Sequence, residues 1–223
     1  TDEVPHGRRI INTILLYSLK PSEGEGADVS DIVMGAYQTG DLVSDVVLNV
    51  ERLHGVAWHL HKLNGKYAIR DRQNPNALIR NAAVDVSETS AKAEIADFIT
   101  NIFGSNAYPV GFRTNDMRDI PDDREVKVVV KDAQWTKEEV KNVITNDGRG
   151  REWRNTLVFV QPSRDKAIES GTRYIDKARY IEGARQVLAD ESLDDEIRTS
   201  IQGMKDQEET ELQEELQLLY GEV

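Results

Sequence analysis

Three arginines in one short segment have the residue type and spacing to bind phosphate. Arg149, Arg151 and Arg154 lie in a glycine-containing stretch just before an apolar run. Guanidinium groups present paired N–H donors that match phosphate oxygens, so such a loop could hold a phosphate of DNA or of a nucleotide bound by another subunit. The alternative is that they are solvated charges or partners of an acidic segment, where each surface pair adds only about 0 to 1 kcal/mol. We take them as candidate phosphate-binding residues.

Two histidines are a possible start of a metal site. His59 and His61 lie two residues apart on a predicted strand, so their side chains face the same side. His54 and Glu51 are close enough in sequence to complete a ligand set. A metal site also needs ligands that converge and further residues that orient them, and spacing alone does not supply either. We predict no metal and keep His59 and His61 as weak candidates; the alternative is two solvated residues of a hairpin.

The patterns of common catalytic sites are missing. A phosphate-binding loop needs a Gly-Lys pair followed by Ser or Thr, but Tyr67 follows the one pair, Gly65-Lys66. The glycines at 24–26 and 148–150 lack the third glycine of the dinucleotide pattern, and no Gly-x-Ser-x-Gly occurs. The segment from Pro121 to Lys127 resembles a nuclease motif, but its acids are too close in sequence to lie on adjacent strands. We therefore expect no catalysis by the chain itself.

Composition and charge set the cellular context. The 223 residues contain no cysteine, no long apolar run and no leader pattern, so we expect a cytoplasmic protein without a membrane anchor. The net charge of −12 is unevenly distributed: residues 190–223 hold 12 acids and 2 bases, a net of −10. Residues 52–80 hold six bases against one acid. A local basic patch therefore lies on a nearly neutral body with an acidic C-terminal segment.

The basic patch falls on elements that are typical of a winged helix. Apolar spacing predicts helices over 8–19, from Asp28 to Tyr37 and over 42–55. A strand over 56–63, the hairpin signal Asn64-Gly65 and a return strand over 67–69 follow. Three helices and a two-stranded hairpin are the order of a winged helix, in which the third helix enters a DNA groove and the hairpin touches the backbone. We assign residues 1–76 to this domain.

On this interpretation the third helix and the hairpin hold the candidate DNA-binding residues. Those on the helix are Asn49, Arg52 and His54, and those on the hairpin are Lys62, Asn64, Lys66, Arg70 and Arg72. Phosphate contacts of this kind give affinity without reading sequence. The same helix also carries Asp45 and Glu51, which DNA would repel. DNA contact and a purely protein-contacting module therefore remain as alternatives.

Residues 77–223 are predicted to form a mixed α/β unit that ends in long acidic helices. Strands over 110–112, 126–130 and 157–160, with a helix capped by Thr136 before the last, suggest a parallel βαβ crossover. Helices over 164–189 and 193–220 follow. The last carries a narrow apolar stripe that suits packing on a neighbour or a coiled coil, so an oligomer could form through it. The whole chain is thus expected to be α+β.

Several fragments together resemble one family, the large prokaryotic AAA-type ATPases with an uncharacterised conserved region, often encoded beside DNA methyltransferases in phage-defence islands. They lie between about residues 10 and 180, in one order: Gly26-Ala27, Leu60-His61, Gly65-Lys66-Tyr67, Asn74 and Asn76, Ile120-Pro121-Asp122-Asp123, and Arg154-Asn155-Thr156-Leu157-Val158-Phe159. The family's Arg-x-Tyr-Leu-Ala-Trp-like helix is replaced here by Arg173-Tyr174-Ile175-Asp176-Lys177. That difference puts the role of this helix in doubt.

The resemblance implies a C-terminal portion that lacks the ATP-binding core. ATP and magnesium would then belong to the parent protein, the core of that protein would be the partner, and duplex DNA would be a further partner. The chain would couple ATP-driven motion to DNA or protein in phage defence. Because the sequence begins at Thr1, we expect a piece of a longer protein. The alternatives are a transcriptional regulator that dimerises through its C-terminal helices, and a hydrolase that uses the histidine pair with a metal.

Overall fold

The computed structural model has mixed α and β secondary structure. It describes residues 4–19, 26–71, 73–112, 120–146, 148–163, 167–169 and 172–221. These divide into two compact units. The first comprises Thr1–Ala82 with Gln186–Met204, and the second comprises Ala83–Arg185 with Lys205–Val223. The division falls inside helices, at 82/83 in α4 (Pro75–Val84) and also in the two C-terminal helices, rather than at residue 76.

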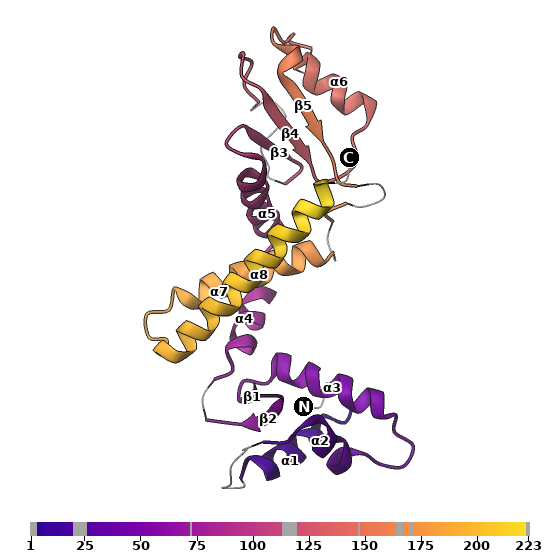
Figure 1. The fold of residues 1–223 in the computed structure, drawn as a ribbon, viewed down its shortest axis with the longest axis vertical. Helices are drawn as coiled ribbons and strands as arrows, with labels where there is room; N and C mark the ends of the chain where they lie inside the picture. Colours follow the sequence, from indigo (N-terminus) through magenta and orange to yellow (C-terminus); the bar gives the residue numbers. More distant parts are fainter. Residues whose placement is uncertain are drawn as a thin grey trace. The chain divides into compact units, whose positions relative to one another are not determined.

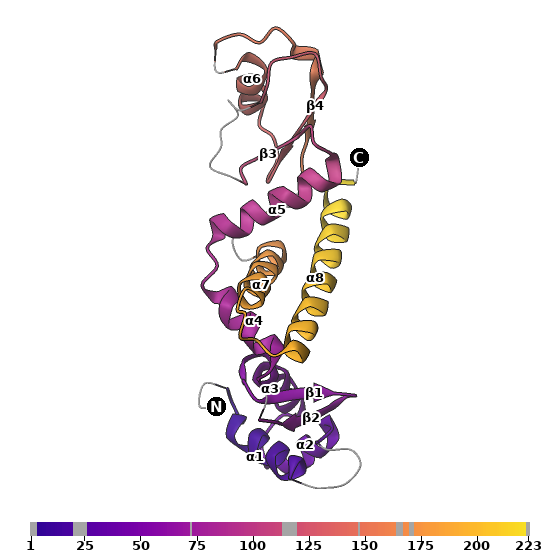
Figure 2. The ribbon, with the colours of Figure 1, turned by 90° about the vertical axis from the view of Figure 1, so that its left-hand side faces the viewer.

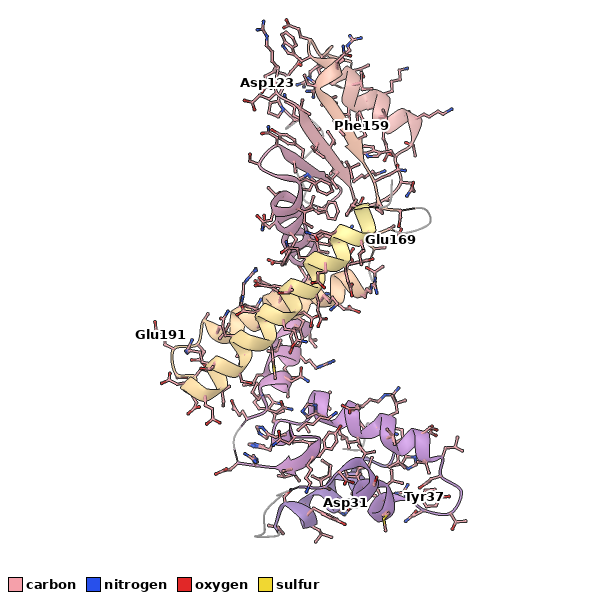
Figure 3. The ribbon with its side chains drawn as sticks, viewed as in Figure 1. Asp31, Tyr37, Asp123, Phe159, Glu169 and Glu191 are labelled. Atoms are coloured by element: carbon pink, nitrogen blue, oxygen red, sulfur yellow. The ribbon has the colours of Figure 1, made fainter. Side chains whose placement is uncertain are left out.

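The first unit begins with three helices and a hairpin, in the predicted order (Figure 1). The helices are α1 (Gly7–Ser18), α2 (Val29–Ala36) and α3 (Val43–Val56), and the hairpin pairs β1 (Leu60–Leu63) with β2 (Lys66–Ile69) in antiparallel register. Helix α2 starts where predicted. Asp31 N donates to Asp28 Oδ1 at 2.8 Å and Asp28 N donates to Asp31 Oδ2 at 3.2 Å, which closes a capping box at Asp31 (Figure 3).

One apolar core joins the helices to the hairpin. Its fully buried members come from every element of the set: Ile10, Ile14, Ile32, Val46, Val50, Leu53, Leu60 and Tyr67. A short backbone bridge adds to it, since Ala27 N donates to Tyr67 O and Tyr67 N to Ala27 O, both at 2.8 Å. The segment before α2 thereby lies along the hairpin as a third extended piece. The core fixes the position of α3 and β1, which carry the candidate interface.

The turn of the hairpin is as predicted, but its first strand is shorter. Asn64 and Gly65 both have positive φ, 51° and 79°, as the tight hairpin turn requires. The strand predicted over 56–63 was wrong at its start, because α3 continues through Val56 and β1 begins at Leu60. The buried amide of Asn74 holds the intervening turn: its Nδ2 donates to His54 O at 2.8 Å and to Leu60 O at 2.9 Å.

The second unit is built on a three-stranded parallel sheet of order β3-β4-β5. The strands are β3 (Ala107–Val110), β4 (Lys127–Lys131) and β5 (Leu157–Val160), and helix α6 (Lys137–Thr145) connects β4 to β5. The predicted βαβ crossover is therefore confirmed. Strand β3 lies earlier than the predicted 110–112, because Gly111 at φ 86° ends it. The unit also contains α5 (Glu88–Phe103) and most of α7 (Arg173–Leu188) and α8 (Asp195–Gly221), whose residues in Gln186–Met204 belong to the first unit.

Alternate side chains of the strands pack on opposite faces of this sheet. Val128, Val130 and Val160 contact the core formed by α5, α7 and α8. Their neighbours Val129, Leu157 and Phe159 contact the core that includes Val143 of α6. Figures 1 and 2 show α6 on one face and α5 on the other, and Figure 3 labels Phe159 on β5. The period of two places the apolar strands between two layers of helix.

Helix α8 uses its apolar stripe inside the chain. Leu212, Leu216 and Leu219 are buried in the core of the second unit. On its flank Lys177 of α7 donates to Glu208 at 2.8 Å and to Glu211 at 2.7 Å, which offsets part of the acidic charge of α8. From the sequence we expect an oligomer to form through the apolar residues of this helix. These residues are already buried within the chain, so they are not open to a second molecule. Among the described residues no helix is long and apolar enough to span a membrane.

The hydrogen bonds at the N-terminus of α6 should make the free energy of unfolding depend on pH. Thr136 and Glu139 form a capping box, and Glu139 also accepts from Lys131 Nζ at 2.6 Å. The hydrogen bond from Lys131 is the main cause that lowers the pKa of Glu139 from 4.5 to about 2. A carboxyl with a lowered folded-state pKa stabilises the fold above its unfolded-state pKa. That contribution is lost as the pH falls from 4.5 towards about 2.

We expect Glu139→Gln to lower the free energy of unfolding near neutral pH by about 1 to 2 kcal/mol, after allowing for partial exposure. Gln at this position retains a capping partner but loses the charge that Lys131 binds. The difference between wild type and variant should shrink towards zero as the pH approaches 2, in urea unfolding at several pH values. A difference that stays constant between pH 7 and the acid limit would show that the charge of Glu139 is not the cause.

Candidate protein and nucleic-acid interface

The outward face of α3 carries one continuous stripe of side chains. Leu42, Asp45, Leu48, Arg52 and Val56 recur at intervals of three and four residues, and all are exposed. We call these five residues the α3 stripe. Its three apolar members remain open to solvent, with exposed fractions of 64% for Leu42, 52% for Leu48 and 55% for Val56. Exposed apolar side chains in a row are unusual on a soluble monomer and mark contact surfaces.

Asn49 does not belong to this face, and its prediction as a DNA contact was wrong. Its side chain points into the helical core and is 3% exposed. Its Oδ1 atom is buried without a hydrogen-bond partner among the described residues. Asn49 lies three residues from Val46 and four from Leu53, and it is buried with these core residues, although its spacing from Asp45 and Arg52 is equally helical. The candidate set on α3 is thereby reduced to Arg52 and His54.

The first lysine of the hairpin already forms an ion pair with a carboxylate of the same chain. Lys62 Nζ donates to Glu51 Oε1 at 2.7 Å, and Tyr67 OH donates to the same oxygen. Burial raises the pKa of Glu51, but the bonds from Lys62 and Tyr67 outweigh it and the pKa is lowered overall. The bond to Glu51 raises the pKa of Lys62. A phosphate that approached Lys62 would have to compete with this pair.

His54 is placed for packing rather than for phosphate contact. It is half-buried, and its ring meets the edge of Tyr67 with centroids 5.9 Å apart. Burial is the main cause that lowers the pKa of His54, so the ring is neutral near pH 7. A neutral imidazole offers one N–H donor and no charge to a phosphate. Its contribution to a basic patch is therefore small.

The remaining DNA candidates differ in placement. Arg52 is exposed on α3, and Asn64 is exposed at the tip of the hairpin. Lys66 is half-buried and Arg70 is exposed, and both have interactions within the chain. Arg72 lies outside the described residues. Of the bases in this patch that the structure describes, Arg52, Lys62, Arg70 and Arg80 are exposed and Lys66 is half-buried.

The histidine pair is not gathered into a metal centre. His59 precedes β1, and its Nδ1 atom lies 3.0 Å from Arg70 O across the hairpin. His61 lies within β1 and is half-buried. Among the residues that the structure describes, no group of three or more His, Asp or Glu side chains is arranged to hold a metal ion.

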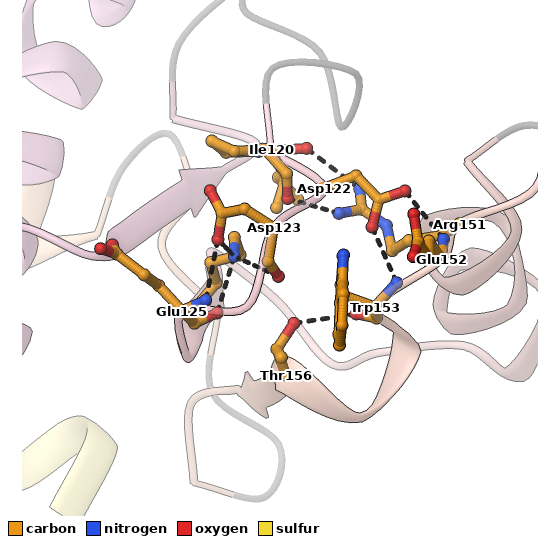
Figure 4. A network of polar contacts seen from close by, with 10 residues as sticks. Ile120, Asp122, Asp123, Glu125, Arg151, Glu152, Trp153 and Thr156 are labelled. Carbon is orange, nitrogen blue, oxygen red and sulfur yellow. Dashed lines mark hydrogen bonds and ion pairs between the residues drawn. The ribbon is translucent and has the colours of Figure 1, made fainter.

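The three candidate phosphate arginines do not act together. Arg151 is 3% exposed, and its guanidinium donates to Pro121 O at 2.6 Å and to Ile120 O at 3.1 Å (Figure 4). Arg149 is exposed, and Arg154 is exposed with its Nε bound to Arg151 O at 3.0 Å. The burial of Arg151 contradicts its prediction as a phosphate ligand, since both Nη atoms donate to the backbone of residues 120–121 and its Nε atom is buried without a partner among the described residues.

Arg151 is part of a network that joins two loops at the amino ends of β4 and β5. Asp122 accepts from the backbone N–H groups of Glu152 at 2.8 Å and Trp153 at 2.9 Å, and the bond from Trp153 is the main cause that lowers its pKa (Figure 4). Lys127, 1% exposed, donates to Glu125 O at 2.6 Å and binds Asp123. The segment that resembles a nuclease motif therefore has a structural role. Its hydrogen bonds with Arg151, Glu152 and Trp153 hold the two loops together, and we call this network the clasp.

The carboxyl edge of the sheet, where open α/β sheets bind ligands, is filled by the chain's own groups. Tyr220 OH donates to Lys131 O at 2.9 Å, and Gln134 Nε2 donates to Pro162 O at 2.7 Å. Trp135 Nε1 donates to Val160 O at 3.0 Å. Sequence reasoning did not identify these residues, since nothing local indicates that α8 returns to this edge. Among the described residues, these bonds tie the carboxyl ends of β4 and β5 to neighbouring segments of the chain.

Comparison of the chain with protein-family models, with curated proteins and with solved structures found no match.

Proposed function

We propose that the chain is the non-catalytic coupling portion of a AAA-type ATPase, with the first unit acting as a winged-helix module that docks on protein through the α3 stripe. The observation that carries the proposal is the composition of the stripe. Three of its five members are exposed aliphatic side chains, one is Asp45, and the single base is Arg52. The order of the three helices and the hairpin, and the bridge between Ala27 and Tyr67, support the winged-helix assignment.

A protein surface suits this stripe better than a DNA groove does. Fully burying an aliphatic side chain stabilises a complex by about 1.5 to 3 kcal/mol, and roughly half of that is still obtainable at Leu42, Leu48 and Val56. A DNA groove offers phosphates and base edges. It would leave these apolar side chains exposed to water, and its phosphates would repel the carboxylate of Asp45. The complementary partner surface has an apolar depression flanked by one base for Asp45 and one acid for Arg52.

The occupant we propose is the phosphate-binding-loop core of the same protein, in line with the family resemblance. ATP and magnesium would then bind that core, and the chain would carry motion from it to a further partner. A role in phage defence follows from the same resemblance, and the proposed cytoplasmic setting follows from the absence of cysteine, of a long apolar run and of a leader pattern in the sequence. The regulator alternative is less favoured, because the apolar residues of α8 on which its dimer depended pack inside the second unit.

The proposal is tested by binding of the chain to the phosphate-binding-loop domain encoded in the same gene, using Leu48→Asp. We expect this variant to weaken the complex at least about tenfold, because it places a charge at the centre of the apolar stripe. Met34→Asp is the matched control, since Met34 is 84% exposed on α2 and lies off the stripe. Circular dichroism and thermal unfolding should show both variants folded.

Two outcomes would overturn this function. The first is a gene without a phosphate-binding loop, or a core that the wild-type chain does not bind. The second is tight binding to a duplex of arbitrary sequence that weakens steeply with salt and is lost in Arg52→Ala, which would identify a DNA-contacting module instead. Equal effects of Leu48→Asp and Met34→Asp would place the docking surface elsewhere on the first unit.

A further inference from the structure

Strand β5 (4 residues) forms an outer edge of the parallel sheet and contains neither proline nor a charged side chain. It pairs with β4 in parallel register. Among the described residues, no other strand pairs with it and no further backbone bond engages Leu157, Val158 or Phe159. All four of its residues are apolar and at least partly exposed, and Val158 is 47% exposed. An edge strand of this kind presents unpaired N–H and C=O groups to any strand that can align with them.

The opposite edge of the same sheet is blocked. Strand β3 contains Pro109, which has no N–H and cannot donate to a further strand. Natural sheets protect their edges with proline, charged side chains or bulges, and β5 has neither proline nor a charged residue between Thr156 and Gln161. The contrast within one small sheet indicates that the β5 edge is left open for pairing.

We propose that β5 pairs with β5 of a second copy of this chain, antiparallel and centred on Val158, to form one continuous sheet across a two-fold axis. In this register Val158 lies opposite Val158 of the partner subunit, and Leu157 lies opposite Phe159 of the partner subunit. Thr156, which ends the 3-10 turn Arg154–Thr156 just before β5, lies opposite Val160 of the partner subunit. Every pair is uncharged, so no like charges meet along the strand.

The register follows from the two faces of the sheet. Directly opposed residues of an antiparallel pair point to the same face. Pairing odd-numbered with odd-numbered residues therefore keeps Leu157 and Phe159 of both copies on the face that α6 covers. Val160 stays on the face of α5 and α8, and strand alternation puts Val158 on the same side. A shift by one residue would place side chains of the α6 face opposite side chains of the α5 and α8 face, so the centre on Val158 preserves both helix layers.

A second copy is favoured over a foreign peptide because β5 is complementary to itself and a closed two-fold contact leaves no further edge on that side. The two outer strands of the resulting sheet would be the β3 strands of the two copies, each of which contains Pro109. The net charge of −12 on each copy opposes association, so the dimer should be stronger when salt screens that repulsion. This inference uses only the second unit and does not depend on the function of the α3 stripe.

Sedimentation equilibrium of the full chain, from micromolar to near-millimolar concentration and at two salt concentrations, tests the proposal. Wild type is expected to show a monomer–dimer equilibrium that salt strengthens. Val158→Lys should raise the dissociation constant at least about tenfold, because a charge at the centre of the edge would be buried. Val84→Lys, at a position 81% exposed on α4, is the control and should behave as wild type.

A cross-link locates the contact. The chain has no native cysteine, so Val158→Cys introduces a single thiol that should join two copies through a disulfide or a short bifunctional maleimide. Val84→Cys should not be joined. A wild-type chain that stays monomeric at every concentration and salt would overturn the proposal. So would a dimer that persists in Val158→Lys, or one that forms without cross-linking at position 158.

Discussion

Replacing Gly26 with alanine should destabilise the first unit by about 3 kcal/mol or more, through two effects that act together. Gly26 has φ 111°, a conformation that residues with a side chain rarely adopt. A Cβ atom there would lie 2.6 Å from Tyr67 O and 3.0 Å from Tyr67 C. Because both atoms belong to the backbone of β2, the contact can be relieved only by moving the strand. The Ala27–Tyr67 bridge would be lost with it.

Gly40 is the control for this substitution, because it has a similar φ of 100° but nothing within 4 Å of an added Cβ. Gly40→Ala should therefore show only the conformational cost, about 1 to 2 kcal/mol. The comparison is made by urea unfolding of the full chain, with hydrogen exchange assigning the change to α1–α3 and the hairpin. Equal losses for the two variants would mean that the contact with Tyr67 adds nothing.

Replacing Arg151 with methionine should destabilise the second unit by about 3 kcal/mol. The substitution removes the charged donor from the carbonyl oxygens of Ile120 and Pro121, and a hydrogen bond to a charged group contributes about 1.5 to 3 kcal/mol. Methionine fills similar space, so the loss of packing is small. The amides of Glu152 and Trp153, now held by Asp122, should exchange hydrogen faster because the clasp loosens.

Arg149→Met is the matched substitution in the same loop, and Arg149 is exposed. Its effect on the free energy of unfolding should lie within about 0.5 kcal/mol of zero. The pair of variants separates the two roles that sequence could not distinguish, a structural clasp and a solvated charge. A stable Arg151→Met variant with unchanged amide exchange would contradict the structural role of this arginine.

Features set by neighbouring residues could be predicted from sequence. The Asn64-Gly65 turn, the caps at Asp28 and Thr136 and the parallel crossover through α6 depend on local conformation and on the spacing of apolar residues. Three helices and a hairpin in this order were predicted for the same reason. The start of β1 was missed, because the turn before it is held by Asn74, a contact from 14 residues away.

The candidate sites were harder to predict, because the role of a polar side chain depends on what the fold places opposite it. Asn49 and Arg151 have the residue types of ligands for DNA or phosphate, but both are buried. Lys62 lies close to Glu51 only because α3 packs across the hairpin. The apolar stripe of α8 correctly indicated a contact, but the partner is the chain's own α5 and α7 rather than another molecule.

The α3 stripe as a protein-docking surface is tested most directly by hydroxyl-radical footprinting of the full chain, alone, with the phosphate-binding-loop domain of the same gene, and with duplex DNA. We predict that the core protects Leu42, Leu48 and Val56 from oxidation, because their exposed aliphatic surface becomes buried. Duplex DNA should leave these three residues as reactive as in the free chain. Protection of the stripe by DNA, or no protection by the core, would contradict the proposal.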